Sequence, residues 1–152
     1  MKNYYYILLL FLTLSVGCDK DDICIEELTP NLIIRFYDYD NTNELKKVDL
    51  DSVYAKDMVA VDNYTSISID SIAIPLDLNS DFTIYNLSSN NEVNQLEFTY
   101  AREEIYLSRS CGYKYNFEEF TTTQNSSTWI KDIQIITNLI NNEEAAHIHI
   151  FH

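Results

Sequence analysis

Short runs in which apolar and polar residues alternate recur along this chain and restrict what it can fold into. Two runs are clearest, with apolar residues at every second position: Leu96, Phe98 and Tyr100, and Tyr113, Tyr115 and Phe117. Successive side chains of a strand point to opposite faces, so this period of two is typical of a strand with one buried face. The chain is therefore expected to be rich in strands.

Further β-rich runs lie at 32–37, 65–69, 72–76, 82–87 and 105–107, bounded by Asn, Asp and Ser. The alternation changes phase at Asp70 and Ser71, which predicts a bulge or a sharp turn. The whole chain has two Gly, so its turns are expected on Asn and Asp, which tolerate positive φ. Many short strands at close spacing favour an all-β fold, an antiparallel, immunoglobulin-like β-sandwich.

The segment 129–140 fits two structures. One helical face would hold Trp129, Ile133, Ile136 and Ile140, whereas Ile133 and Ile135 alternate as in a strand. Its β-branched content and the Asn and Glu residues at 141–144 favour a strand and hairpin. A short helix near the C-terminus is the alternative.

The N-terminus resembles the signal peptide of a bacterial lipoprotein. Lys2 is followed by an apolar run over 4–16, then by Gly17 and Cys18. The run is too short for a membrane span, which needs about 20 residues. The position three before the cysteine is Ser15, where these signals usually have Leu. We predict a signal peptide over 1–17 and a lipidated Cys18 as the first mature residue; an ordinary signal peptide or an uncleaved anchor is the alternative.

An acidic stretch follows Cys18 and completes the predicted domain organisation. Residues 18–23 form an acidic tether and residues 24–152 a single β-sandwich domain. The tether resembles the signal that exports lipoproteins of the Bacteroidota to the outer face of the outer membrane, with a solvated linker as the alternative. The expected location is the outer membrane, lipid-anchored, on the cell surface or the periplasmic face.

The charge of the chain restricts its partners. Without the signal peptide, nine Lys and Arg face 24 Asp and Glu, so the net charge is near −15. A phosphate backbone would be repelled, and nucleic acid is not an expected partner. The hydrophobic fraction of 46% indicates a folded domain rather than an acidic tail.

Two cysteines remain once Cys18 carries lipid. Cys24 and Cys111 would then be the thiols of a chain that has left the reducing cytoplasm, so a disulfide between them is predicted. Two buried free thiols are the alternative, since no spacing rule proves the pair.

Four segments resemble a family of small lipoproteins of the Bacteroidota that has no assigned activity. They are 24–38, 70–76, 102–113 and 148–152. The resemblance covers nearly the whole mature chain. It implies the lipid anchor and a cysteine in each of the segments that hold Cys24 and Cys111, and it assigns no functional residue.

Two groups of residues have some of the spacing of metal ligands. His147 and His149 would share the solvent face of a strand, about 7 Å apart, and His152 would lie on the opposite face. The other group has the every-other-residue spacing of a calcium loop: Asp77, Asn79 and Asp81, with a looser version at Asp38, Asp40, Asn43 and Glu44. Neither group has a full ligand set, and Asn and Asp also form turns. We therefore predict no metal and no cofactor.

Aromatic residues supply a third candidate surface. Phenol rings with a polar tip suit protein- or sugar-binding faces, although they also pack cores, and the candidates are Tyr37, Tyr39, Tyr85, Tyr106, Tyr113 and Tyr115. Asp51-Ser52-Val53 and Asp70-Ser71-Ile72 resemble a short O-glycosylation sequence of exported Bacteroidota proteins.

Two functions are compatible with these residues. The favoured one is a membrane-tethered, non-catalytic module that binds a protein or a glycan of the cell envelope. The alternative is a carboxylate-dependent hydrolase that uses Asp77 and Asp81 or Glu103 and Glu104. Neighbouring Glu103 and Glu104 would point to opposite faces of a strand, and no catalytic motif appears in the sequence, so we predict that the chain is not an enzyme.

Overall fold

The computed structural model describes residues 23–58, 64–126 and 128–152. Within these ranges the chain forms no helix and nine strands: β1 (Leu32–Tyr37), β2 (Val48–Ala55), β3 (Ile67–Ile69), β4 (Ser71–Ile74), β5 (Phe82–Ser89), β6 (Glu92–Ser108), β7 (Gly112–Gln124), β8 (Asp132–Ile135) and β9 (Ile148–Phe151). The predicted all-β class is confirmed. The predicted signal peptide, Cys18 and the tether up to residue 22 lie outside the described residues.

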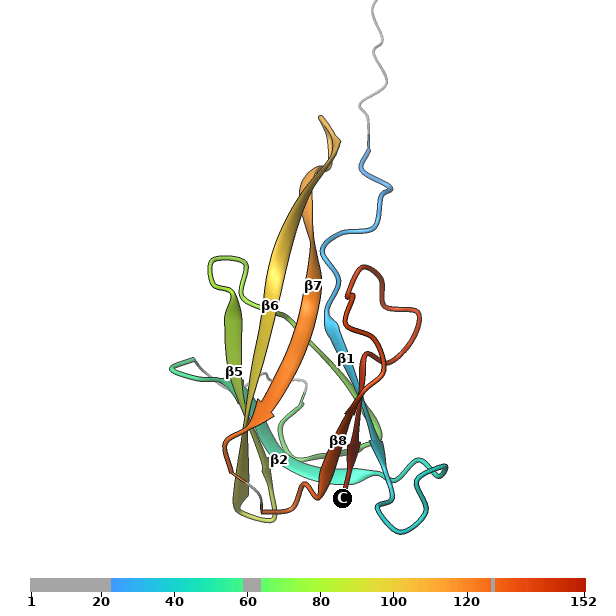
Figure 1. Cartoon of the computed structure of the whole chain (residues 1–152), viewed down its shortest axis with the longest axis vertical. Helices are drawn as coiled ribbons and strands as arrows, with labels where there is room; N and C mark the ends of the chain where they lie inside the picture. The colour runs from blue at the N-terminus through green and yellow to red at the C-terminus, as the bar shows by residue number, and fades with distance from the viewer. Residues whose placement is uncertain (1–22, 59–63, 127) are drawn as a thin grey trace, which may run out of the picture.

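The strands form two packed sheets (Figure 1). One sheet has the order β4-β1-β9-β8 and the other has the order β3-β2-β5-β6-β7. Residues from both sheets are completely buried between them, including Ile34, Phe36, Leu96, Phe98 and Ile150. The predicted β-sandwich is therefore confirmed. Its described strand pairs are antiparallel except that of β1 with β9, which run parallel with Ile34 opposite Ile148.

The change of phase at Asp70 marks the point where the chain crosses from one sheet to the other. β3 pairs with β2 in the five-stranded sheet, whereas β4 pairs with β1 in the four-stranded sheet. The carbonyl of Asp70 accepts a hydrogen bond from the backbone N–H of Phe36 at 2.9 Å. The predicted sharp turn is therefore present, and it lets Ile72 and Ile74 enter the same core from the second sheet.

Two strand predictions need correction. The runs at 96–100 and 105–107 belong to one 17-residue strand, β6. β2 was not among the predicted runs. Its pairing with β5 shifts register between Leu50 and Ser52, and buried Val48, Leu50 and Val53 therefore do not follow a strict period of two.

The C-terminal region is a strand, as favoured, and not a helix. β8 pairs antiparallel with β9. The connection between them covers residues 136–147 and is longer than the expected hairpin turn. In it, Ile140 pairs with Phe117 through two backbone hydrogen bonds of 2.8 and 3.0 Å. This contact holds the connection against the edge of β7.

The β6–β7 hairpin extends beyond the rest of the sandwich (Figure 1). The N-terminal segment runs beside it, and Thr29 Oγ1 accepts a hydrogen bond from the backbone N–H of Tyr115 at 3.0 Å. The predicted disulfide is present: Cys24 and Cys111 are bonded, with their Cα atoms 4.9 Å apart. The described residues contain no helix that is long and apolar enough to span a membrane.

Candidate functional site

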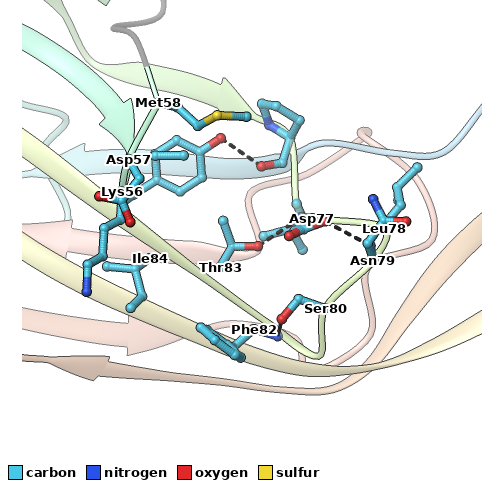
Figure 2. Close-up of a pocket in the computed structure, with 14 residues that line it drawn as sticks. Lys56, Asp57, Met58, Asp77, Leu78, Asn79, Ser80, Phe82, Thr83 and Ile84 are labelled. Atoms are coloured by element: carbon cyan, nitrogen blue, oxygen red, sulfur yellow. Dashed lines mark hydrogen bonds between the residues drawn. The ribbon is translucent and has the colours of Figure 1, made fainter.

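A groove of about 730 Å³ opens between the turn after β2 and the loop that leads into β5 (Figure 2). The turn at 55–58 forms one wall, the loop at 75–80 forms the other, and the first residues of β5 form the floor. Asp57 has a φ of 65°, and the N–H of Met58 donates to the carbonyl of Ala55 at 3.0 Å. This tight turn fixes the position of the groove wall that residues 55–58 form.

Hydrogen bonds attach the 75–80 loop firmly to the sandwich. The backbone N–H of Asp77 donates to Thr83 Oγ1 at 2.8 Å, and the hydroxyl of Tyr100 donates to the carbonyl of Asp77 at 2.9 Å. The two hydroxyls, Thr83 Oγ1 and Tyr100 Oη, lie 2.5 Å apart. Arg102 from β6 binds the carbonyl of Leu78 and the carboxylate of Asp81. The groove is therefore formed before any partner binds.

The accessible lining of the groove is mostly apolar. Met58, Leu78 and Phe82 are exposed by 71%, 38% and 50%, and Figure 2 shows them at separate sides of the groove. Tyr85 lies at the floor, with its hydroxyl donating to the carbonyl of Pro75 at 2.8 Å. Burial, with a smaller effect of Tyr100, raises the pKa of Tyr85 to about 12. Its hydroxyl therefore stays protonated and acts as a structural donor.

Two of the three predicted calcium-loop residues, Asp77 and Asn79, line the groove as part of a turn. Asp77 Oδ1 accepts the backbone N–H of Asn79 at 2.8 Å, which closes a local turn. Asp81 Oδ1 lies 2.9 Å from Arg102 Nη2 and 3.0 Å from Arg102 Nε. A cationic side chain of the protein thus occupies the position next to Asp81. The every-other-residue spacing comes from the turn.

The looser acidic group is also a turn. Asp38 Oδ1 accepts the N–H groups of Asp40 and Asn41 at 2.7 and 3.3 Å. Its other oxygen lies 3.1 Å from Lys46 Nζ. The N–H of Asp40, followed by the side-chain bond to Lys46, lowers the pKa of the Asp38 carboxyl.

The three histidines are separated by their environments. His147 was expected on the solvent face but is only 3% exposed. Its ring lies beside β1 and hydrogen-bonds the backbone there, as a neighbouring strand would. Its Nδ1 accepts the N–H of Ile33 at 2.9 Å, and its Nε2 therefore donates to the carbonyl of Asn142 at 3.0 Å. Both ring nitrogens are used. Burial is the main cause that lowers the pKa of His147.

The other two histidines make aromatic contacts. His149 packs on Tyr37, with ring centroids 4.4 Å apart. His152 contacts Phe36 and Trp129 edge to face, and its Nε2 donates to the carbonyl of Lys46 at 3.2 Å. Burial lowers the pKa of both imidazoles. The described residues hold no group of three or more His, Cys, Asp or Glu side chains that could bind a metal ion.

The carboxylates proposed for a hydrolase lie elsewhere. Glu104 accepts the hydroxyl of Tyr115 at 2.6 Å, and Glu103 lies 3.4 Å from the amide of Asn116. Both bonds cross between β6 and β7 in the projecting hairpin. They are cross-strand contacts on an exposed ribbon, five and six residues along β6 from buried Phe98, or about 16–20 Å at the rise of a strand.

The candidate tyrosines do not form one surface. Tyr85 is buried in the groove floor, and Tyr37 packs on the outer face of the β1–β9 pair. Tyr39 is exposed in the loop after β1. Tyr106 and Tyr113 are exposed at the hairpin tip, with ring centroids 5.2 Å apart. The tip pair is the one that remains accessible as a unit.

The two serines of the glycosylation-like sequences lie in strands. Ser52 is half-buried in β2 and Ser71 is half-buried in β4. Asp51, which precedes Ser52, accepts the N–H of Asn91 at 2.7 Å. These segments are therefore part of the sheets.

Sequence reasoning missed most of the groove. It singled out Asp77, Asn79 and Asp81 for their carboxylate and amide groups but not the apolar residues beside them. A usable signal was present, because Met58, Leu78 and Phe82 are large apolar residues in or next to turn segments that are otherwise polar. Strand alternation does not explain large apolar residues at these turn positions.

One family model matches most of the domain. It describes a family of unknown function, DUF6452, and it matches residues 47–152. The matched part begins immediately before β2 and includes the groove, the hairpin and β9. No curated protein and no solved structure matches the chain.

Proposed function

The chain belongs to the DUF6452 family of unknown function, and we propose that it is a lipid-anchored envelope protein whose sandwich is a non-catalytic binding module. The observation that carries the binding role is the groove between the 55–58 turn and the 75–80 loop. The partner we propose is an apolar segment of another envelope protein.

Two features support the envelope location. The order Lys2, apolar run, Gly17 and Cys18 resembles a lipoprotein signal, and the Cys24–Cys111 disulfide is typical of chains that leave the reducing cytoplasm. Together with the acidic residues after Cys18, they favour the outer membrane of a member of the Bacteroidota, at the cell surface or the periplasmic face.

The groove is well placed for a module that is anchored at the disulfide end. Phe82, at the start of β5, pairs with Thr99 of β6, and the hairpin turn begins after Ser108. Nine residues of extended strand cover about 30 Å. A partner would therefore meet the groove clear of the lipid surface.

The lining favours a protein segment over a glycan. Sugar sites combine a flat aromatic platform with free polar groups, whereas here Met58, Leu78 and Phe82 dominate the accessible lining. The polar groups of the loop, such as the N–H of Asp77 and the carboxylate of Asp81, bind the protein itself. Apolar side chains of a partner would gain about 25 cal/mol for each Å² that they bury here.

The same contacts favour binding over catalysis. Asp77 lines the groove and Asp81 lies beside it, and the Oδ1 atoms of these residues accept bonds from Asn79 and Arg102. The hydroxyl of Tyr85 is held protonated. A general base must face the ligand, whereas Asp81 is not part of the groove lining and the hydroxyl of Tyr85 is bound to the carbonyl of Pro75.

A photocrosslinker in the groove tests the proposal in cells that export the chain. Leu78 is replaced by benzoylphenylalanine, and the matched control has the same residue at Tyr39, which is 53% exposed in the loop after β1. We expect Leu78 to form a specific adduct with one envelope protein. Phe82→Asp should abolish this adduct, because it places a charge among the apolar side chains.

Three results would contradict the proposal. An adduct pattern that is the same at Leu78 and Tyr39 would mean that the groove has no special partner. An adduct that survives Phe82→Asp would mean that its apolar lining does not bind. Crosslinking of Leu78 to glycan instead of protein would contradict the choice of partner.

A further inference from the structure

The end of the molecule that holds the disulfide exposes large apolar side chains. Tyr106 and Tyr113 face each other across the hairpin tip and are 56% and 60% exposed. Ile23 and Ile25 flank Cys24 and are exposed by 81% and 89%, and the bond to Cys111 holds them at the same tip. We call residues 23–25 and 105–115 the tip. Isolated exposed apolar residues are common, but here the hairpin pairs Tyr106 with Tyr113 and the disulfide adds the segment with Ile23 and Ile25.

The charge of the hairpin part of the tip differs from that of the whole molecule. Residues 105–115 contain Arg109 and Lys114 and no Asp or Glu, in a chain whose net charge is −14. On the N-terminal segment, Asp21 and Asp22 precede Ile23, and Glu26 and Glu27 follow Ile25. The acidic body would be repelled by anionic headgroups, whereas Arg109 and Lys114 would be attracted to them.

The chain that precedes the tip limits how far the tip can be from a membrane. Cys24 lies six positions after Cys18, and six extended residues span at most about 20 Å. The described chain begins at Ile23, and the disulfide of Cys24 with Cys111 places this end of the described chain beside the hairpin tip. If Cys18 carries lipid, this end of the domain is the one that faces the bilayer.

We propose that the tip docks on the lipid surface, with Tyr106 and Tyr113 at the level of the headgroups and Ile23 and Ile25 against the acyl boundary. This inference rests on the lipid anchor of the proposed function. Tyrosine suits this position because its ring is apolar and its hydroxyl stays in contact with water and headgroups. Docking would orient the sandwich so that the projecting hairpin lies between the bilayer and the groove and holds the groove away from the bilayer.

Tryptophan reporters test the orientation. The lipidated full chain is reconstituted in vesicles of phosphatidylethanolamine and phosphatidylglycerol, with and without brominated acyl chains, which quench tryptophan on contact. Tyr106→Trp reports on the tip and Tyr39→Trp is the matched control, because Tyr39 is equally exposed in the loop at the opposite end (Figure 1). The wild-type chain, whose single tryptophan is Trp129, supplies the background.

We expect brominated vesicles to remove most of the emission that Tyr106→Trp adds and to leave that of Tyr39→Trp unchanged. Equal quenching of the two reporters, or none of either, in a chain that floats with the vesicles would overturn the docking and leave the anchor standing. A chain that does not float, with an unmodified Cys18 by mass spectrometry, would overturn the anchor and the docking together. Unchanged circular dichroism shows that both variants are folded.

Discussion

The inner and outer halves of the β6–β7 hairpin each contain an alternating run but have different surroundings. In the inner half of β6, Leu96, Phe98 and Tyr100 alternate with polar residues and are buried against the opposite sheet. In the outer half, Tyr113 and Tyr115 of β7 alternate with polar residues, but neither is fully buried. Alternation therefore predicts a strand in both halves, and the side chains are buried only where a second sheet faces them.

Different interactions stabilise the two halves. Phe98 stacks on Phe120 with ring centroids 5.7 Å apart and has no exposed surface. The outer half instead has the bond from Cys111 to Cys24 and the hydrogen bond from Tyr115 to Thr29. A two-stranded ribbon is marginally stable alone, so these links to the N-terminal segment are what keep it extended.

The largest expected effect lies in the inner half. Phe98→Ala removes a completely buried ring from the core, and such changes lower the free energy of unfolding by about 3–5 kcal/mol. Urea denaturation measures the loss. Val93→Ala on the same strand is the control, because Val93 is 40% exposed and should change stability by less than about 1 kcal/mol. Equal losses in the two variants would contradict the division between the halves.

The disulfide is expected to have the next largest effect, and to have it in the outer half. Cys24 and Cys111 are 87 residues apart, and replacing both with Ser should lower the free energy of unfolding by about 2–4 kcal/mol. Hydrogen exchange should show faster opening of residues 101–115, while the amides around Phe98 stay protected. Unchanged hydrogen exchange in the outer half would show that the hairpin stays folded without the Cys24–Cys111 disulfide.

Low pH should reduce stability through the three histidines, which lie in the sandwich and not in the β6–β7 hairpin. Burial lowers the pKa of His147, His149 and His152 below the unfolded value of about 6.5. Between the folded and unfolded pKa values the unfolded chain binds more protons, so the free energy of unfolding rises with pH in that window and is fully present above about pH 6.5. Denaturation at pH 7.5 and 5.5 should therefore show lower stability at pH 5.5.

His147→Gln separates this effect from the titration of carboxylates. The variant replaces Nδ1, the acceptor for the N–H of Ile33, with an amide on a longer and more flexible side chain, which should reduce stability at pH 7.5 by about 1–3 kcal/mol. It should also flatten the dependence between pH 7.5 and 5.5, since one of the three depressed histidines is gone. A variant with the full wild-type dependence would show that His147 does not contribute.

Local sequence patterns predicted the features that depend on neighbours in the chain. The run at 32–37 matches β1, the change of phase at Asp70 matches the crossing between sheets, and the predicted pairing of Cys24 with Cys111 matches the disulfide. β2 was missed because a shift of register between Leu50 and Ser52 breaks the period of two. Each of these outcomes has a local cause.

The candidate site depends on contacts that local patterns do not contain. His147 was expected in water, but the parallel pairing of β1 with β9 brings Ile33 to its ring from 114 residues away. The groove is lined by the 55–58 turn and the 75–80 loop, which are far apart in the sequence. In the sequence, the apolar residues of these segments are isolated among polar ones, and only the fold brings them to one groove. The sequence identified Asp77 and Asp81 because the spacing of carboxylates is visible in one segment.

The smallest expected effect on stability is that of the exposed tyrosine pair in the outer half of the hairpin. Tyr106→Ala removes an exposed ring whose main contact is the ring of Tyr113, and cross-strand pairs of this kind contribute about 0.2–1 kcal/mol. Thermal unfolding should therefore shift by only a few degrees at most, well below the shift from Phe98→Ala in the same strand. A loss as large as that of Phe98→Ala would mean that the outer half has a packed core of its own, and that the tyrosine pair is needed for folding. A small loss would leave both rings available for contacts outside the domain.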